Sequence, residues 1–291
     1  MKAELLKYLQ ERYTAATVKA YIREIENYTN TFTKAERALY KDIVAYVGIL
    51  RKRYPSGKSV RRILGSIKAY YDFLSTTGKR KDNPAKSILL RDRENRDIQL
   101  QDLFTPEELE TLMYREERYN ALEYRNKVLM SLLIYQALQV RELTALTLND
   151  INLEQGSIYI KATGKSSSRE LQLKPNQIML LHQYITEVRN KLMKRKKEQH
   201  LNLLIGQRGE IMSKEDITKH ITRNYKDRYT GRKINAKTIM QSLITSFLKQ
   251  VNDLRIVQVF AGHKYPSTTE RYKQTNVEAL KSAIQIHHPI K

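Results

Sequence analysis

The chain has 291 residues, of which 41% are apolar and 29% charged, a composition typical of a globular protein long enough for two domains. It contains no cysteine, so disulfides and thiolate metal sites are excluded, and its longest apolar runs fall far short of the roughly 20 residues that cross a membrane. The net charge of +22, half of it within residues 1–90, favours a cytoplasmic protein that binds nucleic acid and has no membrane partner.

Residues 1–90 show apolar residues at helical spacing throughout. The pattern predicts four helices, over residues 3–12, 17–32, 42–54 and 59–74. The fourth helix leaves several basic residues on its outer face. We therefore predict a helical DNA-binding domain, and expect DNA contacts from five basic side chains: Lys19, Lys58, Arg61, Arg62 and Lys68.

Residues 91–104 are predicted to be a linker, because this charged stretch has no sustained periodicity. A second domain, residues 105–291, begins where Thr105 can cap a helix and Glu108 can complete a capping box. Further helices are predicted over residues 125–138, 141–146, 237–249, 254–261 and 277–285, and two short strands over 157–161 and 169–173, joined by a hairpin at 164–166.

The most informative stretch lies near the C-terminus. Gly262-His263 is followed by Thr268-Thr269 and then by Tyr272, nine residues after the histidine. In a very basic protein, a tyrosine at this distance from a Gly-His pair indicates phosphate chemistry on nucleic acid.

Three further segments match one family in order and spacing. They are Ala137-Leu138-Gln139-Val140-Arg141-Glu142-Leu143, Gly164-Lys165 on the predicted hairpin, and Leu254 to Tyr272. With them, the chain resembles the tyrosine recombinases, the phage-integrase and Xer-type family. The resemblance implies a mainly α fold: an N-terminal helical core-binding (SAM-like) bundle, then a mixed, mainly helical catalytic domain with a small β-hairpin or sheet.

The resemblance also implies a chemistry and a set of catalytic residues. Tyr272 would attack a DNA phosphodiester and form a 3′-phosphotyrosine, without a metal or other cofactor. Lys165 would protonate the departing 5′ oxygen, and His263 would assist proton transfer. Arginines would normally hold the non-bridging phosphate oxygens.

Three positions depart from the family pattern. Gln139 stands where the first arginine belongs, while Lys237 and Met240 stand where the pattern has His-x-x-Arg. Methionine cannot donate a hydrogen bond to a phosphate oxygen. The nearest compensating cations are Lys237 itself and Arg141. His220-Ile221-Thr222-Arg223 also spells His-x-x-Arg, but it ends 40 residues before His263, so we interpret it as chance on a basic helix.

Two functional hypotheses follow, both with double-stranded DNA as the partner. The first is an active site-specific recombinase or integrase, which the family implies would assemble as a homo-tetramer on paired sites, with residues 277–285 docking onto a neighbouring subunit. The second is a catalytically impaired relative, an accessory or regulatory subunit in a hetero-oligomer with an active recombinase. A transcription regulator that reuses the DNA clamp is a more distant alternative.

Overall fold

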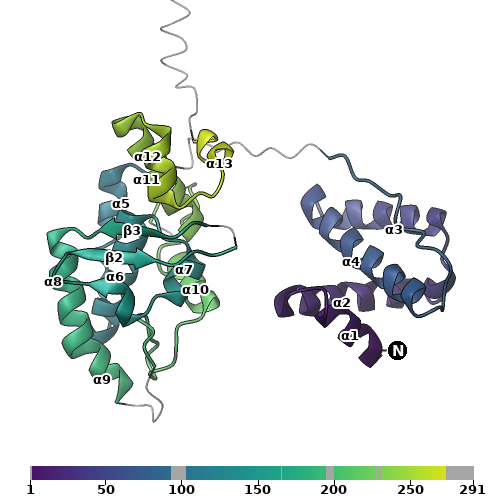
Figure 1. The fold of residues 1–291 in the computed structure, drawn as a ribbon, viewed down its shortest axis with the longest axis horizontal. Helices are drawn as coiled ribbons and strands as arrows, with labels where there is room; N and C mark the ends of the chain where they lie inside the picture. Colours follow the sequence, from purple (N-terminus) through teal and green to yellow (C-terminus); the bar gives the residue numbers. More distant parts are fainter. Residues whose placement is uncertain are drawn as a thin grey trace, which may run out of the picture. The chain divides into compact units, whose positions relative to one another are not determined.

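The chain divides into two compact units, residues 1–96 and 97–291. The computed structural model describes residues 2–92, 103–164, 166–194, 200–226, 228–229 and 231–272. It confirms the predicted class, mainly helical with a small antiparallel sheet (Figure 1). In the part of the chain described, no helix is both long and apolar enough to span a membrane.

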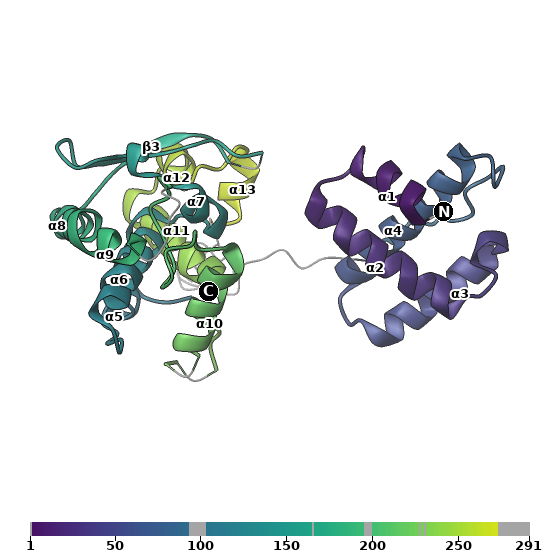
Figure 2. The ribbon, with the colours of Figure 1, turned by 90° about the horizontal axis from the view of Figure 1, so that it is seen from below.

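The first unit is built around one long helix. The predicted helices are confirmed as α1 (Lys2–Gln10), α2 (Ala15–Thr31), α3 (Tyr40–Arg53) and α4 (Gly57–Thr76), with a short 3₁₀ turn, η1 (Ala35–Arg37), between α2 and α3. Half of the residues in α4 are buried, and α4 packs against the other three helices (Figure 2). The apolar periodicity therefore identified the helix that forms the centre of this bundle.

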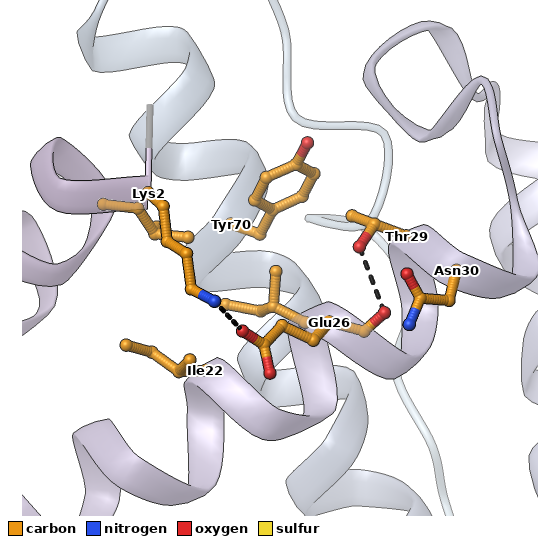
Figure 3. A pocket seen from close by; sticks show the side chains of 8 residues that line it. Lys2, Ile22, Glu26, Thr29, Asn30 and Tyr70 are labelled. Atoms are coloured by element: carbon orange, nitrogen blue, oxygen red, sulfur yellow. Dashed lines mark hydrogen bonds and ion pairs between the residues drawn. The ribbon is translucent and has the colours of Figure 1, made fainter.

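Hydrogen bonds of two buried tyrosine hydroxyls connect α2, α4 and η1. Tyr71 on α4 donates a hydrogen bond to the Ala35 carbonyl at 2.7 Å, so Tyr28 on α2 must donate to the Tyr71 oxygen, 2.6 Å away. Elsewhere in the unit, a pocket of about 400 Å³ lies among α1, α2 and α4, and Figure 3 shows the ion pair between Lys2 and Glu26 that lines it.

The second unit contains the predicted capping box between Thr105 and Glu108. Its helices are α5 (Pro106–Thr111), α6 (Asn120–Gln136), α7 (Val140–Ala145), α8 (Pro175–Gln183), α9 (Arg189–Met193), α10 (Lys214–Asn224), α11 (Ala236–Val251), α12 (Leu254–Ala261) and α13 (Pro266–Glu270), with short turns η3 (Leu148–Asp150) and the π-helical η4 (Tyr184–Val188). The apolar helix α6 contributes buried residues along most of its length, so the core of this unit forms around it.

The sheet has three antiparallel strands in the order β1 (Ile151–Asn152), β2 (Ser157–Ile160) and β3 (Arg169–Gln172). The hairpin of β2 and β3 was predicted, whereas β1 was not, because two residues are too short to show an alternating pattern. Helix α12 contacts β3, which brings the C-terminal motif beside the hairpin (Figure 1). The helix predicted over residues 277–285 lies outside the described residues.

Candidate active site

His263 is placed by the end of a short, well-capped helix. Asp253 caps the start of α12 by accepting hydrogen bonds from the backbone N–H groups of the next turn, at 2.7 and 3.1 Å. The helix ends at Gly262, which adopts a left-handed conformation with φ of 65°. The chain then turns back, and the backbone N–H and carbonyl of His263 bond to Gln258 in α12, each at 3.0 Å.

A buried ion pair lies directly beneath this turn. Arg169, at the start of β3, donates two hydrogen bonds to the Glu142 carboxylate in α7, at 3.0 and 3.1 Å. Both side chains are almost fully buried. Glu142 also accepts a hydrogen bond from the backbone N–H of Gln139. A Cβ on Gly262 would lie 2.3 Å from Arg169 Nη1, so both the left-handed conformation and the space require glycine there.

The tip of the β2–β3 hairpin contacts the same turn. Ser167 donates its backbone N–H to the Gly262 carbonyl at 3.0 Å, and Ser166 forms an isolated antiparallel bridge with His263. Lys165, the predicted proton donor, lies outside the described residues. Three elements far apart in sequence therefore meet at residues 262–263: the hairpin tip, α7 through the ion pair, and α12.

The environment of His263 favours its neutral form. Burial, and secondly the charge of Arg169, lower the pKa of His263 to about 4. Its Nδ1 lies 3.0 Å from the hydroxyl of the buried Thr269. For the Glu142 carboxyl, burial alone would raise the pKa, but the hydrogen bonds and charge of Arg169 outweigh it and hold the pKa below its usual range.

Tyr272 stacks on His263, with ring centroids 5.6 Å apart. Burial raises the pKa of the Tyr272 hydroxyl to about 12. The structure thus brings two of the three predicted catalytic residues into contact, both in uncharged form near neutral pH.

The substituted positions differ in burial and charge. Met240 on α11 packs against the apolar cluster that contains Tyr272. Gln139 is half-buried at the start of α7, and Lys237 is exposed in the first turn of α11. Arg141 is half-buried in α7, and its Nε is buried with no hydrogen-bond partner among the described residues.

Sequence reasoning missed the role of Arg169. The burial of β3 alternates from residue 169 onward, so this arginine points inward with Leu171. An inward arginine needs a buried acceptor, and Glu142 was already part of the α7 motif. That pairing joins residues 27 positions apart, however, and periodicity within one element does not reveal it.

The predicted DNA-contacting cations fall into two groups. Lys19 and Lys58 are exposed, and no side-chain partner occurs for them among the described residues. The others have intramolecular contacts: Arg62 pairs with Glu24 at 2.9 Å, while Lys68 and Arg61 donate hydrogen bonds to backbone carbonyls within residues 86–92. DNA contact by all five stays a prediction.

Comparison with known proteins matches a family model to each of the two units. The model of the phage integrase family matches residues 102–279, and that of the phage integrase N-terminal SAM-like domain matches residues 3–78. The chain is 26% identical to tyrosine recombinase XerD of Listeria innocua over 288 residues, covering 97% of this chain and 95% of that one. It is 24% identical to tyrosine recombinase XerC of Bacillus subtilis, covering 98% and 94%.

Solved structures show the same fold. A XerH site-specific recombinase bound to a palindromic difH substrate superposes with a TM-score of 0.70 at 19% identity, covering 92% of this chain and 79% of that one. A lambda integrase dimer bound to a COC′ core site gives a TM-score of 0.65 at 14% identity, covering 93% of each chain.

The buried ion pair generates a stability prediction. Glu142→Gln should lower the free energy of unfolding by about 3–5 kcal/mol, because it leaves Arg169 buried without a counter-charge. Urea unfolding of the full chain measures this loss. The control is Glu123→Gln, which breaks the more exposed Lys127–Glu123 pair and should cost at most about 0.5 kcal/mol. Equal losses in the two variants would contradict the role given to the Arg169–Glu142 pair.

The neutral state of His263 generates a pH prediction. An unfolded histidine takes up its proton near pH 6.5, whereas folded His263 does so only near pH 4, so stability is lost as pH falls through this window. His263→Gln should therefore reduce the slope of unfolding free energy against pH, by up to about 1.4 kcal/mol per unit near pH 5. Replacement of His182, exposed on α8, is the control, and an unchanged slope in His263→Gln would refute the prediction.

Proposed function

Because the chain belongs to the phage integrase family of tyrosine recombinases, we propose that it binds duplex DNA and takes part in site-specific recombination. The net charge of +22 supports this partner, since neutralising DNA phosphates releases condensed counterions. We propose that the helical domain of residues 1–90 binds the DNA duplex and that the domain of residues 105–291 binds the phosphate at which the strand is cut. Residues 91–104 would link the two. Most contacts should be to phosphates.

The strand-cleavage step of the family can be written with residues of this chain. Tyr272 Oη bonds to phosphorus, and the bond from phosphorus to the 5′ oxygen of the next nucleotide breaks. That oxygen takes a proton from Lys165. The proton of the tyrosine passes to a base, and we assign this role to the neutral ring of His263, which stacks on Tyr272. The reverse reaction with another 5′ end would rejoin the strand without a cofactor.

The packing of Met240 carries the proposal about activity. An apolar side chain lies in the cluster around Tyr272, at the position where the family pattern supplies a phosphate-binding arginine. Gln139 at the other arginine position can donate hydrogen bonds but carries no charge. By analogy with arginine fingers, each such arginine accelerates phosphoryl transfer by roughly 10³–10⁵-fold. We therefore propose that the protein works chiefly as a DNA-binding subunit beside an active recombinase, with cleavage at Tyr272 strongly reduced.

One observation favours the active alternative. The buried Nε of Arg141 has no partner among the described residues, two positions after Gln139 in the chain. A guanidinium with an unused donor can take a phosphate oxygen once DNA is bound. In that case Arg141, with Lys237, replaces the missing arginines.

A nicked suicide duplex distinguishes the two roles. Duplexes that the protein retains are first selected from a random pool, nicked, and shown by gel shift to be bound by the parent and by Tyr272→Phe alike. The main proposal predicts firm binding, at most a trace of slowly formed SDS-resistant adduct from the parent, and none from Tyr272→Phe. Rapid and extensive adduct formation by the parent that Tyr272→Phe lacks would refute the role as a DNA-binding subunit with impaired cleavage and establish the active one.

A matched pair of variants then tests the substitute cation. If an adduct forms, Arg141→Ala should abolish it while leaving the gel shift unchanged, because the proposed contact is to the reacting phosphate. Arg255→Ala removes the same charge from the start of α12 and serves as the control.

A further inference from the structure

A second polar pocket lies in the catalytic domain, apart from Tyr272 and His263. It has a volume of about 300 Å³ and is formed by α6, α10 and residues 206–212. Figure 1 shows α10, which contributes half of the lining residues. The charged side chains lining the pocket are Arg125, Lys219, Arg223, Glu210 and Asp216, together with His220.

Arg125 is a largely buried cation: burial lowers its pKa, and the charges of Glu117, Glu210 and Asp216 do not fully offset this. Only 9% of the residue is exposed. Its Nε donates to the Asn126 side chain at 2.9 Å and its Nη1 to the Ile205 carbonyl at 3.1 Å, while Nη2 makes no hydrogen bond within the described residues. No carboxylate of those residues forms an ion pair with it. Arg125 therefore keeps one guanidinium donor, Nη2, that is free to bind an acceptor in the pocket.

His220 presents a second unused donor beside it. Asn224 donates its side-chain amide to His220 Nδ1 at 2.7 Å, so the ring proton of the neutral imidazole lies on Nε2. That Nε2 is buried and lacks a partner among the described residues. Burial, and secondly the charge of Arg125, lower the pKa of His220 to about 4, in keeping with close approach of the two side chains. Both unused groups are therefore donors, and both line one pocket.

The two carboxylates of the pocket already have other partners. Asp216 accepts hydrogen bonds from the backbone and hydroxyl of Ser213 at the start of α10. Glu210 accepts one from the backbone of Arg208. Three cations against two carboxylates leave the lining with an excess of positive charge.

We propose that this pocket binds a phosphate group, with Arg125 Nη2 and His220 Nε2 donating to its oxygens and Lys219 and Arg223 adding charge at the rim. A tetrahedral oxyanion satisfies all of these donors at once, and arginine–phosphate hydrogen bonds are among the strongest that proteins make. A free phosphorylated molecule and a DNA backbone phosphate share this chemistry. Neither use requires Tyr272, so the proposal stands whether or not the chain cleaves DNA.

Thermal unfolding of the full chain in pyrophosphate against chloride, at equal ionic strength, tests the proposal. The melting temperature of the parent should rise by roughly 3 °C when the pyrophosphate concentration is ten times its dissociation constant. His220→Phe keeps a flat ring without the donor, so it should lose most of this gain without a lower melting temperature in chloride. Arg223→Ala should lose part of the gain. Lys214→Ala, which removes a charge from the same helix outside the pocket, should keep it.

A second experiment measures the affinity for duplex DNA as a function of salt concentration. If a backbone phosphate fills the pocket, Arg223→Ala should lower the slope of log affinity against log salt by about 1, relative to Lys214→Ala. If a free anion is the ligand, the DNA slope stays unchanged and only the pyrophosphate shift is lost. The proposal is overturned if His220→Phe and Arg223→Ala match the parent in both the pyrophosphate and the DNA measurement.

Discussion

The buried pair of Arg169 and Glu142 is the interaction on which the geometry of the catalytic domain depends. It joins β3 to α7, and Arg169 Nη1 comes so close to Gly262 that the end of α12 has no room for a side chain. The same carboxylate accepts a hydrogen bond from the backbone of Gln139, the residue that precedes α7. Because an isolated buried charge is costly, removing either partner strains all three elements together. The hairpin tip and His263 thus keep their places through contacts that involve no catalytic arginine.

The elements that position His263 and Tyr272 are distinct from the positions that depart from the family pattern. The turn at Gly262, the stacked rings of His263 and Tyr272, and the hairpin contact are all present. The departures fall at the positions where the family pattern has phosphate-binding residues: Met240 packs against an apolar cluster, and Gln139 carries only a neutral amide. Under the proposed function, the chain keeps the recombinase fold and binds DNA, while the charges that would stabilise the reacting phosphate are lost.

Local patterns in the sequence predicted much of the fold but less of the site. Apolar periodicity located the four helices of the first unit, and motif register located His263, Tyr272 and the substituted positions. Contacts between distant residues were beyond such patterns. Arg61 and Lys68 look like free cations on a basic helix face, yet they donate to carbonyls of residues 86–92. His220 looked like chance on a basic helix, and only its burial beside Arg125 identifies a pocket.

The most direct test of the central claim restores the two missing charges. On the selected suicide duplex, the single-turnover rate of adduct formation is compared between the parent and a Gln139→Arg, Met240→Arg double variant, after both are shown to be folded and to bind equally. If only the arginines are missing from an intact scaffold, the double variant should form the adduct at least about 10³-fold faster. Equal rates, or no adduct from the double variant, would contradict the account.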